Sequence, residues 1–138
     1  MMINDHMPEY TVERCGKILN RHRKALNGSR VLVLGVAYKQ DIDDYRESPA
    51  LRVIEELEKT GASVTFYDPY ISEYRYHGKS HKGEAALSAG LLRNTDLVVV
   101  TAAHTNVDYD FVQRHAPAGF DTKNVMKAVA VRTNIEVL

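Results

Sequence analysis

The sequence predicts an α/β fold, a Rossmann-like three-layer sandwich with a mostly parallel sheet that is preceded by one N-terminal helix. The first observation is that short strand-like runs, at residues 31–34, 63–67 and 97–101, alternate with segments of helical spacing. Strands that alternate with helices form parallel sheets covered on both faces. The second observation is the length of 138 residues, which fits one domain. Because crossovers between parallel strands are right-handed, the arrangement is expected to be Rossmann-like.

Residues 1–27 predict one amphipathic helix. It is expected to begin after Asp5 or His6, with Pro8 in the first turn, a position that suits the missing N–H of proline. Apolar residues recur at helical spacing at Val12, Cys15, Ile18 and Leu19. The turn residues Asn-Gly-Ser at 27–29 end it. A lone amphipathic helix needs a partner surface, which can lie beyond this chain.

The remaining elements follow in chain order. Each strand is predicted from an apolar or β-branched run, and each helix from helical spacing or a stop signal such as Gly61 or Pro117. Strands are expected at 30–36, 63–67, 97–101 and 118–121; helices at 47–60, 84–90 with extension to 93, and 109–115; and a turn with a helical start at 122–128. Residues 68–83 show no clean period and are expected to form a loop.

Composition excludes several classes of function. Eighteen basic residues balance eighteen acidic ones, so no global field recruits nucleic acid or a membrane. The apolar runs are too short for a spanning helix, and the N-terminus lacks the apolar segment of a signal peptide. The single cysteine, Cys15, excludes an intrachain disulfide and fits a reducing cytoplasm; its helical setting predicts a packing or surface thiol. No metal-ligand spacing is present.

The candidate site is the polar loop 39–44, between the first strand and the helix that follows it. Open α/β sheets bind anions at the carboxyl ends of their strands, close to helix N-termini. Lys39 is the only cation of the loop, and it can meet a phosphate or remain a solvated loop lysine. Gly35 is not followed by the other glycines of a GxGxxG motif, so the usual dinucleotide-binding mode is not expected.

Three aspartates in the same loop, Asp41, Asp43 and Asp44, invite a metal-site interpretation. Two of them are adjacent, so their side chains diverge, and helix N-capping by Asp43 or Asp44 is the expected use. Arg46 falls just inside the predicted helix start, where the helix dipole disfavours a cation. Two explanations of Arg46 stay open: an anionic ligand, or an ion pair with a neighbouring aspartate.

Four further residues are predicted at the same edge of the sheet. Asp68 follows the second strand, where it can bind a ribose or form an Asx-Pro turn. His104 follows the third strand, and it can face the crevice or serve as a hydrogen-bonded loop histidine. Lys123 and Asn124 follow the fourth strand.

These segments resemble a known family. Residues 31–51, VLVLGVAYKQDIDDYRESPAL, closely resemble the signature of the C-terminal domain of the UDP-glucose/GDP-mannose dehydrogenase family. Further similarity lies at residues 67–70, 101–104 and 120–124, and residues 7–12 resemble the stretch that leads out of the family's central helical domain. The resemblance covers nearly the whole chain. The DIDD variant at 41–44 looks most like the branch that acts on UDP-N-acetylglucosamine and UDP-N-acetylmannosamine.

The resemblance implies a domain organisation and an activity. Residues 1–27 would be the end of the central helical domain or a linker helix, and residues 28–138 the nucleotide-sugar-binding C-terminal domain. Family members are NAD-dependent 6-dehydrogenases that oxidise the C6 alcohol of a nucleotide sugar to a carboxylate; this chain is expected to be cytoplasmic. Their NAD-binding domain and catalytic cysteine segment do not occur in this sequence, so the chain alone should be inactive. Its implied partners are a UDP-sugar, the missing domains and further copies in the full-length enzyme.

The resemblance also implies residue roles. Tyr38 and Lys39 match positions that contact the UDP-sugar, with the lysine near the diphosphate. Arg46 matches an arginine that reaches across the interdomain cleft to the NAD pyrophosphate. Lys123 and Asn124 match a substrate-binding pattern in which the family often has arginine at the first position, so the charge is kept and the bidentate fork is lost.

No catalytic residue and no metal ligand are expected in this chain. The alternative function is a non-catalytic truncated module that acts in oligomerisation or regulation, with the apolar face of helix 8–26 as its contact surface.

Overall fold

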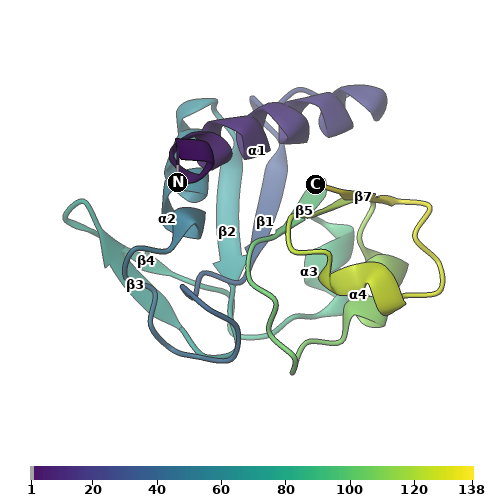
Figure 1. Cartoon of the computed structure of the whole chain (residues 1–138). Helices are drawn as coiled ribbons and strands as arrows, with labels where there is room; N and C mark the ends of the chain where they lie inside the picture. The colour runs from purple at the N-terminus through teal and green to yellow at the C-terminus, as the bar shows by residue number, and fades with distance from the viewer. Residues whose placement is uncertain (1) are drawn as a thin grey trace.

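A five-stranded, fully parallel sheet forms the middle layer of the computed structural model, which describes the backbone of residues 2–138 and the side chains of residues 7–138 (Figure 1). The strands of the sheet are β1 (Arg30–Leu34), β2 (Ser63–Tyr67), β5 (Leu97–Val100), β6 (Gly119–Asp121) and β7 (Ile135–Val137). Their spatial order is β2-β1-β5-β6-β7, and each neighbouring pair is parallel. The predicted fold class is therefore confirmed.

The two central strands, β1 and β5, are buried on both faces, as continuous apolar runs predict. Along β1, Val31 and Val33 point into one core, whereas Leu32 and Leu34 point into the other. The strand β5 alternates in the same way, and its register places Val31 beside Leu97. The chain therefore has two apolar cores, one on each side of the sheet.

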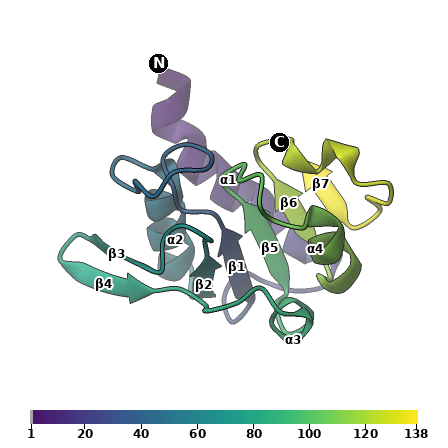
Figure 2. The same ribbon diagram turned by 90° about the horizontal axis from the view of Figure 1, so that it is seen from below.

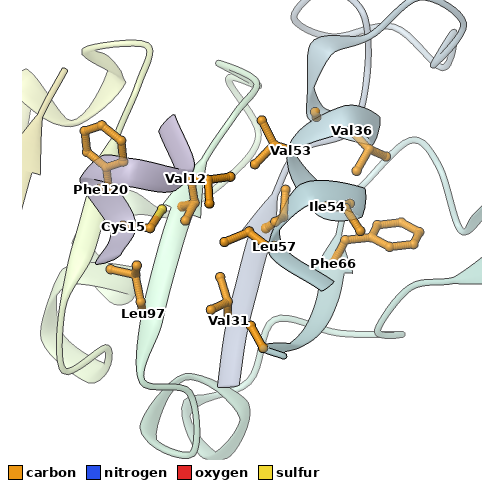
Figure 3. Packing of buried hydrophobic residues seen from close by; sticks show 14 of the residues in the cluster. Val12, Cys15, Val31, Val36, Val53, Ile54, Leu57, Phe66, Leu97 and Phe120 are labelled. Carbon is orange, nitrogen blue, oxygen red and sulfur yellow. The ribbon is translucent and has the colours of Figure 1, made fainter. Parts of the chain in front are cut away.

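Helices cover both faces. One face is covered by α1 (Met2–Arg21) and α2 (Pro49–Lys59), the other by α3 (Ala89–Arg93) and α4 (Tyr109–His115), as the two views show (Figures 1 and 2). A short 3₁₀ helix, Val125–Ala128, connects β6 to β7. In the core beneath α1 and α2, Cys15 lies near Val12, Leu97 and Phe120, and Leu57 of α2 belongs to the same cluster (Figure 3).

The first helix differs from its prediction in two ways. It begins at Met2, so Pro8 lies inside it and removes one backbone hydrogen bond from its interior. Its apolar face also needs no surface beyond this chain, because Cys15, Ile18 and Leu19 are buried against the chain's own sheet and α2. That face cannot be the contact surface that the non-catalytic hypothesis requires.

Several element boundaries shift for local reasons. The strand β1 ends at Leu34 rather than at residue 36, because Gly35 turns the backbone with a φ of 96°. The helix α2 begins at Pro49 rather than at Glu47, whose φ of 63° is not helical. The helix predicted from residue 84 is confined to Ala89–Arg93, after the cap Ser88. No helix within residues 2–138 has both the length and the apolar character needed to cross a membrane.

Two elements were not predicted: β7, and a hairpin formed by β3 (Glu73–Tyr76) and β4 (Lys79–Lys82) within the expected loop. The turn residues His77 and Gly78 both have positive φ, 49° and 78°, as a tight type I′ hairpin turn requires. Tyr74 fastens the hairpin to the core, since its ring lies 5.2 Å from that of Phe66 and is only 2% exposed. The hairpin stands beside α2 and β2 (Figure 2).

Candidate functional site

The strand order places a topological switch point between β1 and β5. The chain leaves β1 toward β2 on one side and later returns to β5 on the other, so the loops after β1 and β5 diverge and leave a crevice at the strands' carboxyl ends. Gly35 lets these two loops approach closely: a Cβ on it would lie 2.5 Å from the Cβ of Ala102. The candidate loop is therefore held directly against the start of the loop after β5.

The loop from Tyr38 to Asp44 is closed on itself. The backbone N–H of Tyr38 donates to the carbonyl of Asp44 at 2.7 Å, which brings the two ends of the loop together. Asp41, near its middle, has a positive φ of 60°, a conformation that aspartate tolerates better than most residues. The side chains of Tyr38 and Lys39 project from the closed loop and are exposed.

The helix that follows the loop is capped by Ser48, so the prediction that Asp43 or Asp44 caps it is wrong. The Ser48 hydroxyl accepts the backbone N–H of Ala50 at 3.3 Å and donates to the carbonyl of Ala37 at 3.3 Å. Pro49 occupies the first helical position, where no backbone donor is needed. The buried Ser48 therefore joins the start of the helix to Ala37, the residue just before the loop.

Arg46 lies before the helix rather than inside it, and it forms an ion pair with Asp44. Its Nε and Nη2 donate to the two carboxylate oxygens at 3.1 and 3.2 Å, a bidentate arrangement. These hydrogen bonds from Arg46 hold the pKa of the Asp44 carboxyl below its usual value. Of the two explanations for this cation, the ion pair is present; the arginine side chain is nevertheless 83% exposed.

A buried pair, Asp68 and His104, lies beneath the loop. The Oδ2 atom of Asp68 accepts the backbone N–H groups of Val36 at 2.8 Å and Ala37 at 3.2 Å, and lies 2.8 Å from Nε2 of His104. The other imidazole nitrogen, Nδ1, accepts the N–H of Asp41 at 2.8 Å. Of the two roles open for His104, the hydrogen-bonded loop histidine is correct.

Asp68 also determines whether the turn after β1 can bind the pyrophosphate of a dinucleotide. The backbone N–H groups after the first strand are the donors that cradle a pyrophosphate in the usual Rossmann mode. Here those of Val36 and Ala37 are taken by the Asp68 carboxylate, which also accepts the N–H of Tyr70 at 2.8 Å in an Asx turn. The turn after β1 therefore does not fit a dinucleotide pyrophosphate. The Asp68 carboxylate is already engaged by these groups, so it cannot bind a ribose.

An open cleft of about 760 Å³ lies over this edge of the sheet. Its walls include Tyr38, Lys39, Arg46 and Lys123, so four of the five predicted binding residues share it. A second hollow of about 340 Å³ lies between the loops after β1 and β5, and Tyr38, Lys39 and Lys123 line it too. Asn124, the fifth, is among the lining residues of neither hollow.

The charge of the larger cleft is strongly positive. Five cationic side chains line it against one carboxylate, that of Glu47: Lys39, Arg46, Arg52, Arg75 and Lys123. Arg46 is paired with Asp44, and Arg52 forms an ion pair with Glu9. The other three have no ion pair with any residue that the structure describes. Unpaired cations around an open hollow attract an anionic ligand.

The buried carboxylate of Asp121 positions the backbone of Lys123. The carboxylate of Asp121 accepts the backbone N–H of Lys123 at 3.0 Å and that of Met126 at 2.7 Å, which orders the turn after β6. Asn124 takes the left-handed conformation in this turn, with a φ of 55°. Its observed role is thus a backbone one, whereas the Lys123 side chain is exposed toward the cleft.

Sequence analysis missed two groups at the site. Arg75 and Tyr76, which line the cleft, belong to the unpredicted hairpin. Thr105 and Tyr70 hold Asp41: the Thr105 N–H and hydroxyl donate to its carboxylate at 2.8 and 2.9 Å, and the Tyr70 hydroxyl at 3.4 Å. The alternation of residues on both sides of His77-Gly78 could have indicated the hairpin. No local sequence pattern indicates the contacts of Asp41.

The remaining chemical groups add no reactive centre. Cys15 is completely buried, and this burial raises the pKa of its thiol to about 12, so the prediction of a packing thiol is confirmed. Among residues 7–138, no cluster of three or more His, Cys, Asp or Glu side chains could hold a metal ion. The chemical character of the cleft is therefore set by the cationic side chains that line it.

Known proteins share this sequence and fold. A family model described as the UDP-binding domain of the UDP-glucose/GDP-mannose dehydrogenase family matches residues 32–128. The chain is 33% identical over 132 residues to a UDP-N-acetyl-D-mannosamine dehydrogenase of Methanocaldococcus jannaschii, a match that covers 90% of this chain and 28% of the relative. It is 37% identical over 98 residues to a UDP-glucose 6-dehydrogenase of Haloferax volcanii, over 71% of this chain and 22% of the relative.

Solved structures agree. The structure of an NDP-N-acetyl-D-galactosaminuronic acid dehydrogenase from Methanosarcina mazei superposes with a TM-score of 0.80 at 28% identity, over 99% of this chain and 30% of that one. A UDP-N-acetyl-mannosamine dehydrogenase from Staphylococcus aureus gives a TM-score of 0.68 at 30% identity, over 99% of this chain and 30% of that one. The chain thus spans less than a third of the length of these relatives.

Proposed function

The chain belongs to the UDP-glucose/GDP-mannose dehydrogenase family as its UDP-binding domain, and we propose that its cleft holds the diphosphate of a UDP-sugar between Lys39 and Lys123. The observation that carries the proposal is the shared lining of the two hollows by these two lysines, neither of which is paired with a carboxylate of the described residues. A lysine ammonium is a compact point charge suited to phosphate oxygens.

Neighbouring groups support the same ligand. The helix α2 begins at the wall of the cleft with Ser48 and Pro49, so its positive dipole end favours a phosphate there. Tyr38 is 48% exposed at the cleft, and the ammonium of Lys39 lies 5.8 Å from its ring centre. The exposed ring offers an apolar face to a base or a sugar, next to the cation that takes the phosphate.

The activity of a complete enzyme is a wider proposal. We infer that this domain serves a cytoplasmic, NAD-dependent 6-dehydrogenase of polysaccharide biosynthesis that acts on a UDP-N-acetyl-hexosamine, converting its C6 alcohol to a carboxylate. Relatives with such printed names support the choice of sugar. Since the turn after β1 does not fit a pyrophosphate, NAD would be bound mainly by another domain, toward which the exposed Arg46 would face.

Two further parts of the proposal concern assembly. Residues 1–27 would connect this domain to the central domain of the complete enzyme, and the nucleotide-sugar-binding part would comprise residues 28–138. The complete enzyme would be a homo-oligomer. The chain alone would bind the UDP-sugar without oxidising it, since it contributes no catalytic residue.

The test is a titration of the chain with UDP, followed by amide NMR. We expect shifts at Tyr38, Lys39 and residues around Lys123. Lys39→Ala or Lys123→Ala should weaken binding about tenfold or more, the usual cost of losing a hydrogen bond to a charged group. The matched control is Lys59→Ala, which removes a lysine from the far end of α2, paired there with Glu56. Uridine, which lacks phosphate, should bind far more weakly.

The outcome that would refute the proposal is specific. If UDP shifts only residues away from the carboxyl edge of the sheet, or if uridine binds as well as UDP, the two lysines do not hold a diphosphate. Equal loss of affinity in the Lys59→Ala control would point to a general charge effect instead.

A further inference from the structure

We propose that His104 is a positioning residue for the anion-binding loop: its uncharged imidazole bridges Asp68 and the backbone of Asp41, and so fixes the loop that presents Tyr38 and Lys39. The inference rests on the proposed function, because it concerns the same diphosphate site. It adds that nucleotide affinity should depend on a histidine that lines neither of the two hollows.

The hydrogen bonds of the ring assign its tautomer. His104 is 1% exposed, and the Asp68 side chain that it meets is completely buried. The Asp68 carboxylate is an acceptor, since Val36 and Ala37 donate their N–H groups to the same oxygen that faces Nε2. Nε2 must therefore carry the ring proton, which leaves Nδ1 bare to accept the N–H of Asp41.

Asp41 is the point at which this bridge acts on the loop. It is two residues from Lys39, in a loop closed by the hydrogen bond between Tyr38 and Asp44. The bond from its N–H to His104 holds the backbone of this residue in its positive-φ conformation from below. Its carboxylate is held from the side by Thr105, and these bonds keep the pKa of Asp41 below its usual value. Without the imidazole acceptor, the Asp41 N–H would be left unsatisfied in a partly buried place, and the loop would have to move.

The groups that face His104 are the carboxylates of Asp68 and Asp41, the latter 3.9 Å from Nδ1, and the ring of Tyr70 at 4.9 Å. The Tyr109 hydroxyl bonds only to the backbone carbonyl of His104, at 2.8 Å.

Loss of the imidazole acceptor would therefore deprive the loop of the backbone bond that shapes it. We expect nucleotide affinity to fall when that acceptor is removed.

Two substitutions separate the two halves of the bridge. In His104→Asn the amide oxygen can stand near the position of Nδ1 and still accept the N–H of Asp41. In His104→Gln the amide nitrogen can reach Asp68, but the acceptor for Asp41 is lost. The matched control is His22→Gln, an exposed histidine after α1 that lies outside the cleft.

The probe is UDP-N-acetylglucosamine, whose affinity for the chain is measured by calorimetry at neutral pH. His104→Gln should bind it about tenfold more weakly, the cost of one unmet buried hydrogen bond. His104→Asn should stay within about threefold of the unaltered chain. The His22→Gln control should keep the full affinity.

Hydrogen exchange at the Asp41 amide gives a readout that needs no ligand. Its protection should fall in His104→Gln and persist in His104→Asn. If the unaltered chain does not bind the nucleotide, the proposed function fails, and the exchange data still decide the role of His104. Equal Asp41 protection in all variants, or equal loss of affinity in both His104 variants, would overturn the inference.

Discussion

Replacing Gly35 by alanine tests whether the site depends on close contact between the loops after β1 and β5. Two costs arise. The φ of 96° places an alanine in a region that disfavours a Cβ by about 1–2 kcal/mol. The new Cβ would also lie 2.5 Å from the Cβ and 2.9 Å from the backbone nitrogen of Ala102, an overpacking that costs about 1–3 kcal/mol more.

The matched control is Gly28→Ala. Gly28 has a similar φ of 87°, but nothing lies within 4 Å of the Cβ that it would acquire. It should therefore lose only the conformational share, about 1–2 kcal/mol, whereas Gly35→Ala should lose about 2–5 kcal/mol. The smaller unfolded-state entropy of alanine affects both variants alike and cancels in the difference.

The assay is urea unfolding followed by far-UV circular dichroism and by tyrosine fluorescence, since the chain has eight tyrosines and no tryptophan. Coincident transitions would establish that a single free energy of unfolding applies. UDP titration of the folded Gly35→Ala variant should also show weaker binding. If the two alanine variants lose the same stability, the contact with Ala102 is not what the glycine serves, and the reasoning fails.

Three further predictions follow. The thiol of Cys15, whose pKa burial raises to about 12, should not react with a thiol reagent at neutral pH until urea unfolds the chain; rapid reaction of the folded chain would contradict its burial. The hydrogen bond from the Thr105 N–H lowers the pKa of Asp41 below its ordinary value of 3.8, so its contribution to stability is present above about pH 4 and is lost as the pH falls through the folded-state value. Asp41→Asn should flatten that part of the acid-unfolding curve, which an unchanged curve would disprove. Ser48→Ala removes the cap of α2 and should cost about 1 kcal/mol in urea unfolding, whereas no loss would mean that the Ala50 N–H finds another acceptor.

Apolar runs made most of the sheet predictable. Residues 31–34 and 97–100 are so uniformly apolar that only doubly buried strands fit them, and the structure has both. The helix α2 was predicted from residue 47, two residues too early, and Asp43 or Asp44 was given the capping role that Ser48 holds. The carboxylate of Asp44 is engaged by Arg46 instead, a competition between neighbours that spacing does not reveal.

Long-range pairs of polar residues limited the prediction of the site. Asp68 and His104 each follow a predicted strand, so their presence at one edge was foreseeable from topology. In the structure the two side chains face each other at 2.8 Å, so the Asp68 carboxylate cannot bind a ribose. This contact depends on side-chain directions, which only the packing of the folded chain determines. The hairpin that brings Arg75 to the cleft was missed because its alternating residues are tyrosine and histidine rather than aliphatic.

The ion pairs between α1 and β7 bear on how the chain reaches its fold. Arg14 and Arg21 both pair with Glu136, and Arg14 also donates to the carbonyl of Val137, 123 residues along the chain. During synthesis, α1 therefore emerges long before the strand that completes its contacts. Its apolar face, with Cys15 and Ile18, stays uncovered until the sheet has assembled. Such distant contacts slow folding, because their loop entropy must be lost before they contribute any stability. The helix α1, which is made before the sheet, is thus among the last elements to be secured.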